Sequence, residues 1–227
     1  DDRHMGIFTG LINLVCFLML VAKAITHRCN WKKMDRVLMK CHKPICVLLI
    51  VSCFMHMIFV LPVLKNRSVF VIITGIVSFF VMVILICLCH IIKEKKKKML
   101  WHKFLAIIMA ICIVGHIVTY IIDFKNYQQK VTNIVFEDIE LANMKDGTYQ
   151  GEYNVGYIYA KVEVEIRNHK IVSINIVEHR NERGESAEKI IDDMVEKQEI
   201  HVDAVSGATN SSNVIEKAVE NALNGEN

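Results

Sequence analysis

The stretch HVDAVSGATNSSN, residues 201–213, is a polar loop rich in Ser, Gly and Thr that runs into a short helix. Apolar residues recur after it with helical spacing, at Val214, Ile215, Ala218, Val219, Ala222 and Leu223. We therefore expect Ser211, Ser212 or Asn213 to cap this helix, with its unpaired backbone N–H groups facing the loop. A helix end of this kind suits a phosphate group.

Two residues of this loop are suited to a bound ligand. Gly207 lets the backbone approach a ligand closely, and Thr209 offers a hydroxyl that could be esterified as well as hydrogen-bonded. The alternative is an ordinary capped loop, because small polar residues commonly precede helices. The chemistry of the residues alone leaves both interpretations open.

Residues 203–212, DAVSGATNSS, resemble the signature of the FMN-binding domain family, found in the flavin-carrying subunits of sodium-pumping quinone reductases and Rnf-type complexes. In that family the last Thr of Ser-Gly-Ala-Thr carries FMN through a phosphoester bond made by a separate flavin transferase. The resemblance implies covalent FMN on Thr209. It also implies FMN contacts from the neighbouring residues, which are Asp203, Ser206, Gly207, Ala208, Ser211 and Ser212.

The likeness to this family extends from Asp146, through the β-rich segment 161–177, to the final helix. It also implies contacts to the flavin ring from the polar segment 179–185, including Glu185. An FMN-binding domain would therefore occupy the whole C-terminal part of the chain.

The composition indicates a membrane protein. Of the 227 residues, 53% are hydrophobic, and the mean hydropathy is +0.33, which is too apolar for an ordinary soluble domain. Residues 1–4 precede Met5, and we expect them to be a cloning remnant outside the fold. Met5 is then the natural start, and no cleavable signal is expected, because the first apolar run is long enough to stay in the bilayer.

Four apolar runs are each long enough to cross a bilayer of ~30 Å as a helix of about 20 residues. They are residues 6–26, 44–64, 69–92 and 100–122. The sequence therefore predicts a membrane four-helix bundle over residues 5–122.

The connections between these runs differ in charge. The first, counted together with Lys23 at the end of the first run, has seven Lys or Arg residues against Asp35. The third, counted together with Lys103 at the start of the fourth run, has six Lys residues against Glu94. The middle connection has only Lys65 and Arg67 as charged residues. By the positive-inside rule, the two basic connections are predicted to be cytoplasmic, and everything after the fourth run is predicted to be outside.

Residues 123–227 contain 11 Lys or Arg and 20 Asp or Glu residues, so this part is predicted to be a separate acidic domain. We read residues 123–143 as a connector and 144–227 as the FMN-binding domain. Alternation of period two predicts an antiparallel meander, with strands within 149–159, 161–166 and 171–177. A helix over 185–198 and the closing helix complete a small α+β domain.

All eight cysteines lie between Cys16 and Cys112, so no disulfide is expected in the C-terminal domain. Most of them lie in apolar runs, where they behave as small hydrophobes. A cysteine metal site is not favoured, because the closest pair, Cys87 and Cys89, faces different sides of a helix.

Four histidines form a pattern in the membrane part, where histidine is costly unless it has a partner. His42 and His56 are 14 residues apart, and so are His102 and His116. Fourteen residues are two heptads, so each pair shares one helix face and is separated by about 21 Å along the axis. Helices two and four run in the same direction, which would place His42 level with His102 and His56 level with His116. Two such levels are what two bis-His haem sites require.

The alternative is that these histidines are polar residues satisfied by Ser or backbone partners, which explains one histidine more easily than two equal spacings. His27, His90 and His169 are expected to be interfacial or surface residues. Gly75 and Gly115 could make room for a porphyrin, although small residues also serve plain helix packing.

Two His-x13-His helices in a small bundle resemble the ferric-reductase-like and related dihaem b-type membrane cytochromes. They resemble more closely the four-helix cytochromes associated with flavinylated extracytoplasmic domains. The resemblance implies two haem b groups, with His42, His56, His102 and His116 as the axial ligands of iron.

We expect a transmembrane electron relay, an oxidoreductase component that carries electrons from a quinol or cytoplasmic donor through the haems to FMN and an extracytoplasmic acceptor. Reverse flow stays open. The rivals are a terminal reductase with its own acceptor site beside the flavin, and a haem-free membrane anchor that displays a flavin-binding module. The expected partners are membrane lipid and a flavin transferase. A nucleic-acid partner is not expected, since the lysines at 95–98 lie close to two spans, and no Gly-x-Gly-x-x-Gly motif suggests a nicotinamide site.

Overall fold

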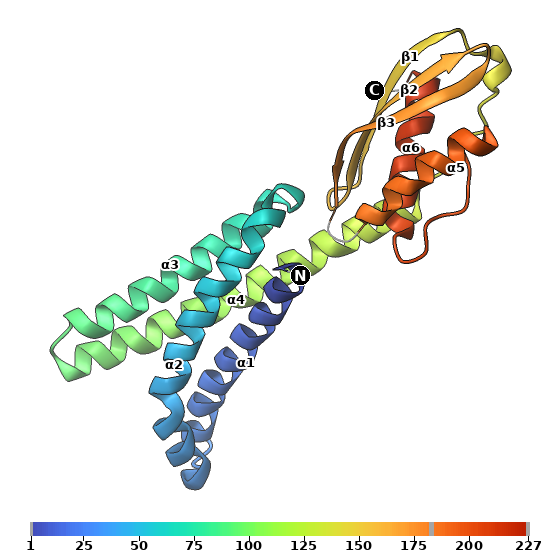
Figure 1. Cartoon of the computed structure of the whole chain (residues 1–227). Helices are drawn as coiled ribbons and strands as arrows, with labels where there is room; N and C mark the ends of the chain where they lie inside the picture. The colour runs from blue at the N-terminus through green and yellow to red at the C-terminus, as the bar shows by residue number, and fades with distance from the viewer. Residues whose placement is uncertain (1, 182–183, 226–227) are drawn as a thin grey trace. The chain divides into compact units, whose positions relative to one another are not determined.

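The computed structural model describes residues 2–181 and 184–225 (Figure 1). Four long helices come first, α1 (Asp2–Arg28), α2 (Lys32–Val60), α3 (Val69–Ile91) and α4 (Lys95–Thr132). Within the described residues, these four helices are long and apolar enough to cross a membrane. The predicted four apolar helices followed by a small α+β domain are thereby confirmed. The chain divides into two compact units, Asp1–Lys65 and Asn66–Asn227.

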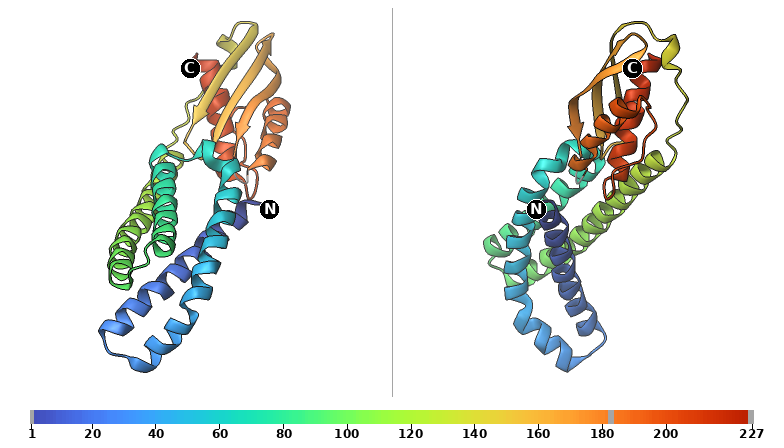
Figure 2. Two further views of the ribbon diagram at one scale, coloured as in Figure 1. Left: turned by 90° about the vertical axis from the view of Figure 1, so that its left-hand side faces the viewer. Right: turned by 45° about the vertical axis from the view of Figure 1, so that its right-hand side comes forward.

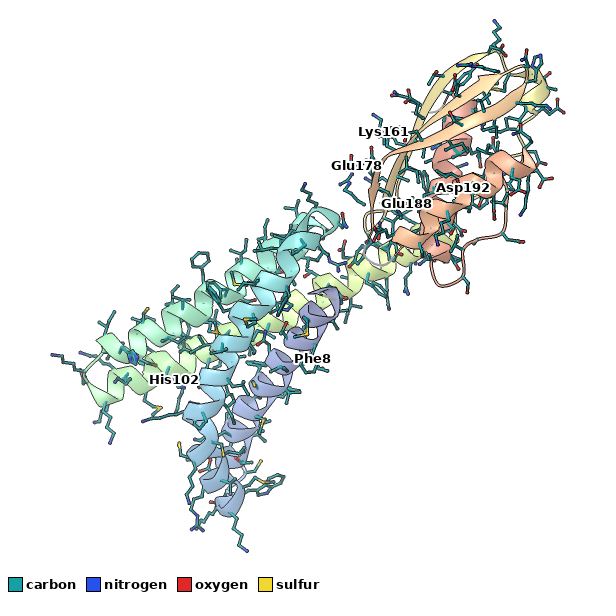
Figure 3. All side chains as sticks on the ribbon, in the orientation of Figure 1. Phe8, His102, Lys161, Glu178, Glu188 and Asp192 are labelled. Carbon is teal, nitrogen blue, oxygen red and sulfur yellow. The ribbon has the colours of Figure 1, made fainter. Side chains whose placement is uncertain are left out.

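The first unit is a helical hairpin of α1 and α2, which lie side by side (Figure 2). The connection between them is short and contains Asn30 in the left-handed conformation, with a φ of 58°. Inside the hairpin, the hydroxyl of Ser52 donates a hydrogen bond to the side-chain oxygen of Asn13. On the outside, Phe8 is 55% exposed, as expected of a side chain that faces lipid (Figure 3). The 3-10 helix η1 (Leu61–Asn66) follows α2.

The second unit begins with a hairpin of α3 and α4. Ser68 caps α3, since its hydroxyl accepts the N–H of Val71 at 3.4 Å. The 38 residues of α4 span about 57 Å, which is much longer than the hydrocarbon core of a membrane. The helix continues to Thr132, so the first half of the predicted connector 123–143 is helical.

The physical reason for this extension is that α4 keeps an apolar face beyond its long apolar stretch. Tyr127 and Val131 on this face pack into the hydrophobic core of the C-terminal domain. Tertiary packing therefore holds the end of the helix, although polar residues surround it. The remainder of the connector is irregular apart from the 3-10 turn η2 (Leu141–Asn143).

The C-terminal domain contains an antiparallel sheet with the order β1 (Gly147–Asn154), β2 (Tyr159–Arg167) and β3 (Lys170–Arg180). This is the predicted meander. The expected alternation over residues 149–159 is interrupted, because a loop that contains Gly156 with a φ of +96° separates β1 from β2. The turn between β2 and β3 has positive φ at both Asn168 and His169, as in a type I′ hairpin.

Two helices cover one face of this sheet, α5 (Ile190–Lys197) and α6 (Thr209–Asn224) (Figure 1). The predicted helix over 185–198 begins as the 3-10 helix η3 (Glu185–Lys189). β1 crosses α6 at backbone contact, since a Cβ on Gly151 would overlap the backbone of Ala218 and Ala222. The fully buried core includes Val162, Val164, Ile166, Ile190, Met194, Val214, Ile215 and Val219.

Candidate functional site

The loop before α6 is closed by its own hydrogen bonds. The N–H of Ala208 donates to the carbonyl of Val205 at 2.9 Å, and Gly207 between them has a φ of +79°. Ser212 is fully buried, and its hydroxyl accepts the N–H of Val205 at 3.0 Å and donates to the carbonyl of Ala208 at 3.2 Å. The loop conformation is therefore fixed from the first turn of α6, and its left-handed residue must be glycine.

Thr209 is the first residue of α6, and its side chain is exposed. The residue before the helix is Ala208, and no side chain in the described part of the chain caps this helix end. The prediction that Ser211, Ser212 or Asn213 caps the helix is therefore wrong. The helix begins earlier because Ser212 binds the preceding loop instead. An exposed hydroxyl thus stands beside the uncapped N–H groups of a helix N-terminus, which suits an esterified phosphate.

The other predicted contact residues differ in exposure. Asp203 and Ser206 are exposed on the same loop. Ser211 is buried beneath Gly184, and a Cβ on Gly184 would overlap the Ser211 hydroxyl. Ser212 therefore holds the loop, and Ser211 packs against the turn at Gly184. The predicted contacts of both residues to FMN stay predictions.

The segment predicted to contact the flavin ring lies next to this loop. Gly184 against Ser211 joins the two, and Glu185 follows Gly184 as an exposed residue at the start of η3. The N–H of Gly184 donates to the side-chain oxygen of Asn181 at 2.9 Å, which shapes the turn. Residues 182–183 of this segment lie outside the described residues. The structure thus brings together two parts of the predicted site, joined by Gly184 and Ser211, which are 27 residues apart in the chain.

A partly buried pair of His201 and Glu216 lies on the other side of the loop. His201 Nδ1 lies 2.6 Å from a carboxylate oxygen of Glu216, and its Nε2 lies 3.2 Å from the carbonyl of Glu137. Burial alone would lower the pKa of His201, but the hydrogen bonds to Glu216 and Glu137 outweigh it and raise this pKa. Burial also raises the pKa of Glu216, against the opposing effect of the His201 hydrogen bond. His201 thereby links the loop, α6 and the connector.

Residues that the sequence did not single out also reach the loop. The side-chain amide of Asn210, next to Thr209, donates to the hydroxyl of Tyr127 at 3.0 Å. Tyr127 stacks on Tyr157 from the β1–β2 loop, with ring centroids 4.7 Å apart. The four-residue spacing of His116, Tyr120 and Phe124, with Tyr127 on the same face, could have revealed this continuation of α4.

In the first hairpin, His56 of α2 packs on α1. Its Nδ1 lies 2.8 Å from the carbonyl of Gly6, so Nδ1 carries the proton and donates it. Thr9 Oγ1 lies 3.5 Å from the same nitrogen. A Cβ on Gly10 would approach the ring to 3.2 Å, so Gly10 gives the imidazole its space.

In the second hairpin, His116 of α4 packs on α3 in the same way. Thr74 Oγ1 lies 3.1 Å from His116 Nδ1 and donates to the carbonyl of Phe70 at 2.9 Å, so it can accept the Nδ1 proton. A Cβ on Gly75 would approach the ring to 3.1 Å. The space at Gly75, which we expected a porphyrin to use, is therefore filled by the imidazole of His116. Gly115 has nothing within 4 Å of its Cβ position.

The two hairpins thus share a repeated contact. Thr9-Gly10 of α1 receives His56, and Thr74-Gly75 of α3 receives His116. In the sequence, His42-Lys43 and His102-Lys103 stand at matching places before His56 and His116, which suggests a distant repeat of α2 in α4. The Thr-Gly pairs extend this repeat to α1 and α3. They could have been found by comparing the first and third apolar runs of the sequence.

The remaining histidines fall into two groups. His42 and His102 are partly exposed on α2 and α4, and His102 Nδ1 lies 3.5 Å from Cys89 Sγ near the α3–α4 turn (Figure 3). His27, His90 and His169 are exposed, in agreement with the surface locations expected for them. The pairing of His42 with His102 and of His56 with His116 stays a prediction.

His56 and His116 fit the chemistry of an axial haem ligand. Metal-ligating histidines usually donate the other ring N–H to an oxygen, which fixes the tautomer and the ring orientation. Nδ1 of both residues faces such an oxygen, so Nε2 would be the iron-binding atom. Among the residues that the structure describes, no group of three or more His, Cys, Asp or Glu side chains is placed to hold a metal ion.

Comparison with known families matches residues 156–224 to the FMN-binding domain. The match begins in the β1–β2 loop and ends with α6, so it contains the Thr209 loop and the segment that packs against it. No curated protein and no solved structure matches the chain. The family match supports an FMN-binding domain after the four apolar helices.

Proposed function

We propose that the protein is a membrane flavocytochrome, which passes electrons between two b-type haems and an FMN attached to Thr209. The observation that carries this proposal is the exposed Thr209 hydroxyl at an uncapped helix start, within the part of the chain that matches the FMN-binding domain. An FMN-binding domain suggests flavin-based electron transfer, and its position after four apolar helices suggests that the electrons cross a membrane.

Several residues around Thr209 would each make a different contribution to FMN binding. A phosphoester would join the Thr209 oxygen to the phosphate, and a separate flavin transferase would make this bond. The N–H groups of the first turn of α6 would face the phosphate oxygens, where the positive end of the helix dipole favours a negative charge. Ser212 and Gly207 would keep the loop closed, and Glu185 with its neighbours would contact the ring.

The membrane histidines would hold the haems. His56 and His116 would form the outer site and His42 and His102 the inner one. The orientation of His56 by Gly6 and of His116 by Thr74 supports this assignment, because both rings are held for binding through Nε2. When bound, haem iron moves single electrons and a flavin takes up one or two, so the pair can convert single-electron traffic into two-electron delivery.

The charge of the connections supports an outward-facing FMN domain. The donor would then be a quinol or a cytoplasmic protein, and the acceptor an extracytoplasmic partner. A terminal reductase with its own acceptor site and a haem-free anchor are the rival functions.

A visible spectrum of the purified protein tests the proposal. We expect b-type haem bands that sharpen on reduction with dithionite, together with flavin fluorescence that stays with the chain on a denaturing gel. Flavin without haem bands would favour the anchor. The absence of both haem bands and flavin would overturn the proposal.

A further inference from the structure

We propose that a column of aromatic rings positions the loop of residues 201–208 before α6, called the flavin loop below, on the end of α4. The same rings would couple an FMN on Thr209 electronically to a haem on His116. The column consists of Tyr120, Phe124 and Tyr127 of α4 and Tyr157 of the β1–β2 loop. This inference rests on the proposed function, which it deepens by naming the residues between the two cofactor sites.

The rings of the column follow one another at contact distance. Tyr120 stacks on Phe124 with centroids 6.4 Å apart and an interplanar angle of 12°. Phe124 lies 6.0 Å from Tyr127 and 5.9 Å from Tyr157. Tyr127 and Tyr157 are stacked at 4.7 Å and 21°. These separations are those of interacting aromatic pairs, so the π systems form one uninterrupted series.

The two ends of the column lie at the two predicted cofactor sites. Tyr120 follows His116 by one helical turn on the same face of α4. Tyr127 accepts the hydrogen bond of Asn210, the residue directly after Thr209. The rise along α4 from His116 to Tyr127 is about 16 Å. The column therefore covers the distance from a haem ligand to the flavin attachment site.

Charged and polar groups of the α2–α3 turn hold the column from one side. The guanidinium carbon of Arg67 lies 4.0 Å from the centroid of Tyr157 and 5.8 Å from that of Tyr120. The N–H of Ser68 donates to the carboxylate of Asp123 at 3.4 Å. These contacts connect the hairpin of α3 and α4 to the β1–β2 loop beside the aromatic rings.

Packing alone does not account for the choice of aromatic residues. Val131 continues the same face of α4 into the domain core, and it is aliphatic like most of that core. Tyr127 and Tyr157 also border an open groove of about 540 Å³ lined by polar residues such as Asn126 and Lys130. The rings thus lie between the domain core and this groove.

The proposed electron transfer leaves the oxidation state of the aromatic residues unchanged. Each transfer oxidises a ferrous haem iron by one electron and reduces the flavin by the same electron, or the reverse. The aromatic side chains supply the coupling and end each transfer in their original state. Electron tunnelling falls steeply with distance, so the column acts by holding the groups close and by filling the gap with π systems.

The test compares Tyr127→Leu and Phe124→Leu with the control Phe80→Leu in the full-length protein. Phe80 is an exposed aromatic residue of α3 whose ring contacts Phe79, away from the column and from the loop. Flavin is photoreduced by a light flash with EDTA as the electron donor, and reduction of the haem is followed by its absorbance. Amide hydrogen exchange of residues 203–210 is measured on the same samples without light.

We expect both column variants to retain covalent flavin and haem, and to slow flavin-to-haem transfer by about tenfold or more, because small displacements of reacting groups cost rates of that order. Exchange protection of residues 203–210 should fall by roughly three- to tenfold, the worth of an aromatic pair. Tyr127→Phe should restore the transfer rate while leaving the loop less protected, since it keeps the ring and loses the Asn210 contact. The control should leave the transfer rate unchanged.

Transfer rates and loop protection at wild-type values in both column variants would overturn the inference. A wild type without haem or FMN would overturn the proposed function instead, and the exchange comparison would still decide whether the column positions the loop.

Discussion

The imidazole of His116 lies directly over Gly75, and a methyl group on Gly75 would come within 3.1 Å of its Cε1 atom. Gly10 stands in the same relationship to His56, with a separation of 3.2 Å. Both separations are shorter than ordinary van der Waals contact, so a larger residue would force the ring to move. These glycines therefore set the position of the two histidines predicted to bind the outer haem.

Gly75→Ala is expected to displace the His116 ring and to lower the free energy of unfolding of the helical part by about 1–3 kcal/mol, as overpacking does. Haem content and the position of the haem absorption bands should change with it. Gly115→Ala is the matched control, because it adds the same methyl group one residue from His116 with nothing within 4 Å. Equal effects of the two substitutions would mean that Gly75 does not position the ring.

His56→Ala should remove a ligand of the outer haem and reduce haem content to roughly half, since one of two sites is lost. The measurement is the haem-to-protein ratio from the absorbance of the reduced protein. His90→Ala serves as the control, because His90 is exposed on α3 and belongs to no predicted site. A loss of haem as large in the His90 variant would show that the ligands are misassigned.

Thr209→Ala should abolish covalent flavin, because the ester oxygen is removed, and should leave the four long helices folded. In-gel flavin fluorescence under denaturing conditions measures the attachment. Thr148→Ala removes another exposed threonine, on β1 of the same domain, and should leave fluorescence unchanged. Fluorescence that survives in the Thr209 variant would place the flavin elsewhere.

The His201–Glu216 pair predicts a pH dependence of the domain. The pKa of His201 is raised above its ordinary value of 6.5, so the folded state binds the proton more tightly than the unfolded state. The resulting stabilisation is fully present below the ordinary pKa and is lost as the pH rises through the folded value. The raised pKa of Glu216 acts in the same direction.

Hydrogen-exchange protection of α6 in the full chain should therefore decrease from about pH 6 to pH 9, after correction for intrinsic exchange rates. His201→Gln should flatten this dependence, whereas His169→Gln, in the exposed β2–β3 turn, should preserve it. An unchanged slope in the His201 variant would assign the pH dependence to other groups.

An impermeant protease should release the FMN domain from right-side-out vesicles, because the basic connections are predicted to be cytoplasmic. We expect cleavage within residues 133–143 rather than within 123–132, since α4 protects the earlier residues as a continuous helix. Mass spectrometry of the released fragment locates the cut. Release that requires permeabilised membranes would invert the topology and the direction of the proposed relay.

The elements of the chain were predictable wherever a regular pattern dominated the sequence. The four apolar runs and the strand alternation before and after Asn168-His169 specify helices and a meander locally. The start of α6 was not predictable in the same way. Ser212 is a good capping residue, but it binds the N–H of Val205 instead, and only the folded loop reveals this choice.

The end of α4 shows the same limit on a larger scale. Polar residues such as Lys125, Gln128 and Gln129 suggest a connector, whereas Tyr127 and Val131 extend the helix by packing on a domain that is distant in sequence. The packing of His116 on Gly75 likewise depends on how two apolar helices align, since many registers bury similar surfaces. The histidine spacing was visible in the sequence, but the residues that orient each ring were not.

Because α4 is continuous from its apolar part to the C-terminal domain, the helical register fixes where Thr209 lies relative to His116. One residue inserted between His116 and Tyr127 would turn everything beyond it by about 100° and lift it by about 1.5 Å. The Asn210 contact would then face the wrong side of the helix. An insertion of seven residues would nearly restore the direction but move the flavin loop about 10 Å further out. A carrier on a loose tether would tolerate either change, whereas this continuous helix would hold an FMN on Thr209 at one fixed distance from the apolar part of α4.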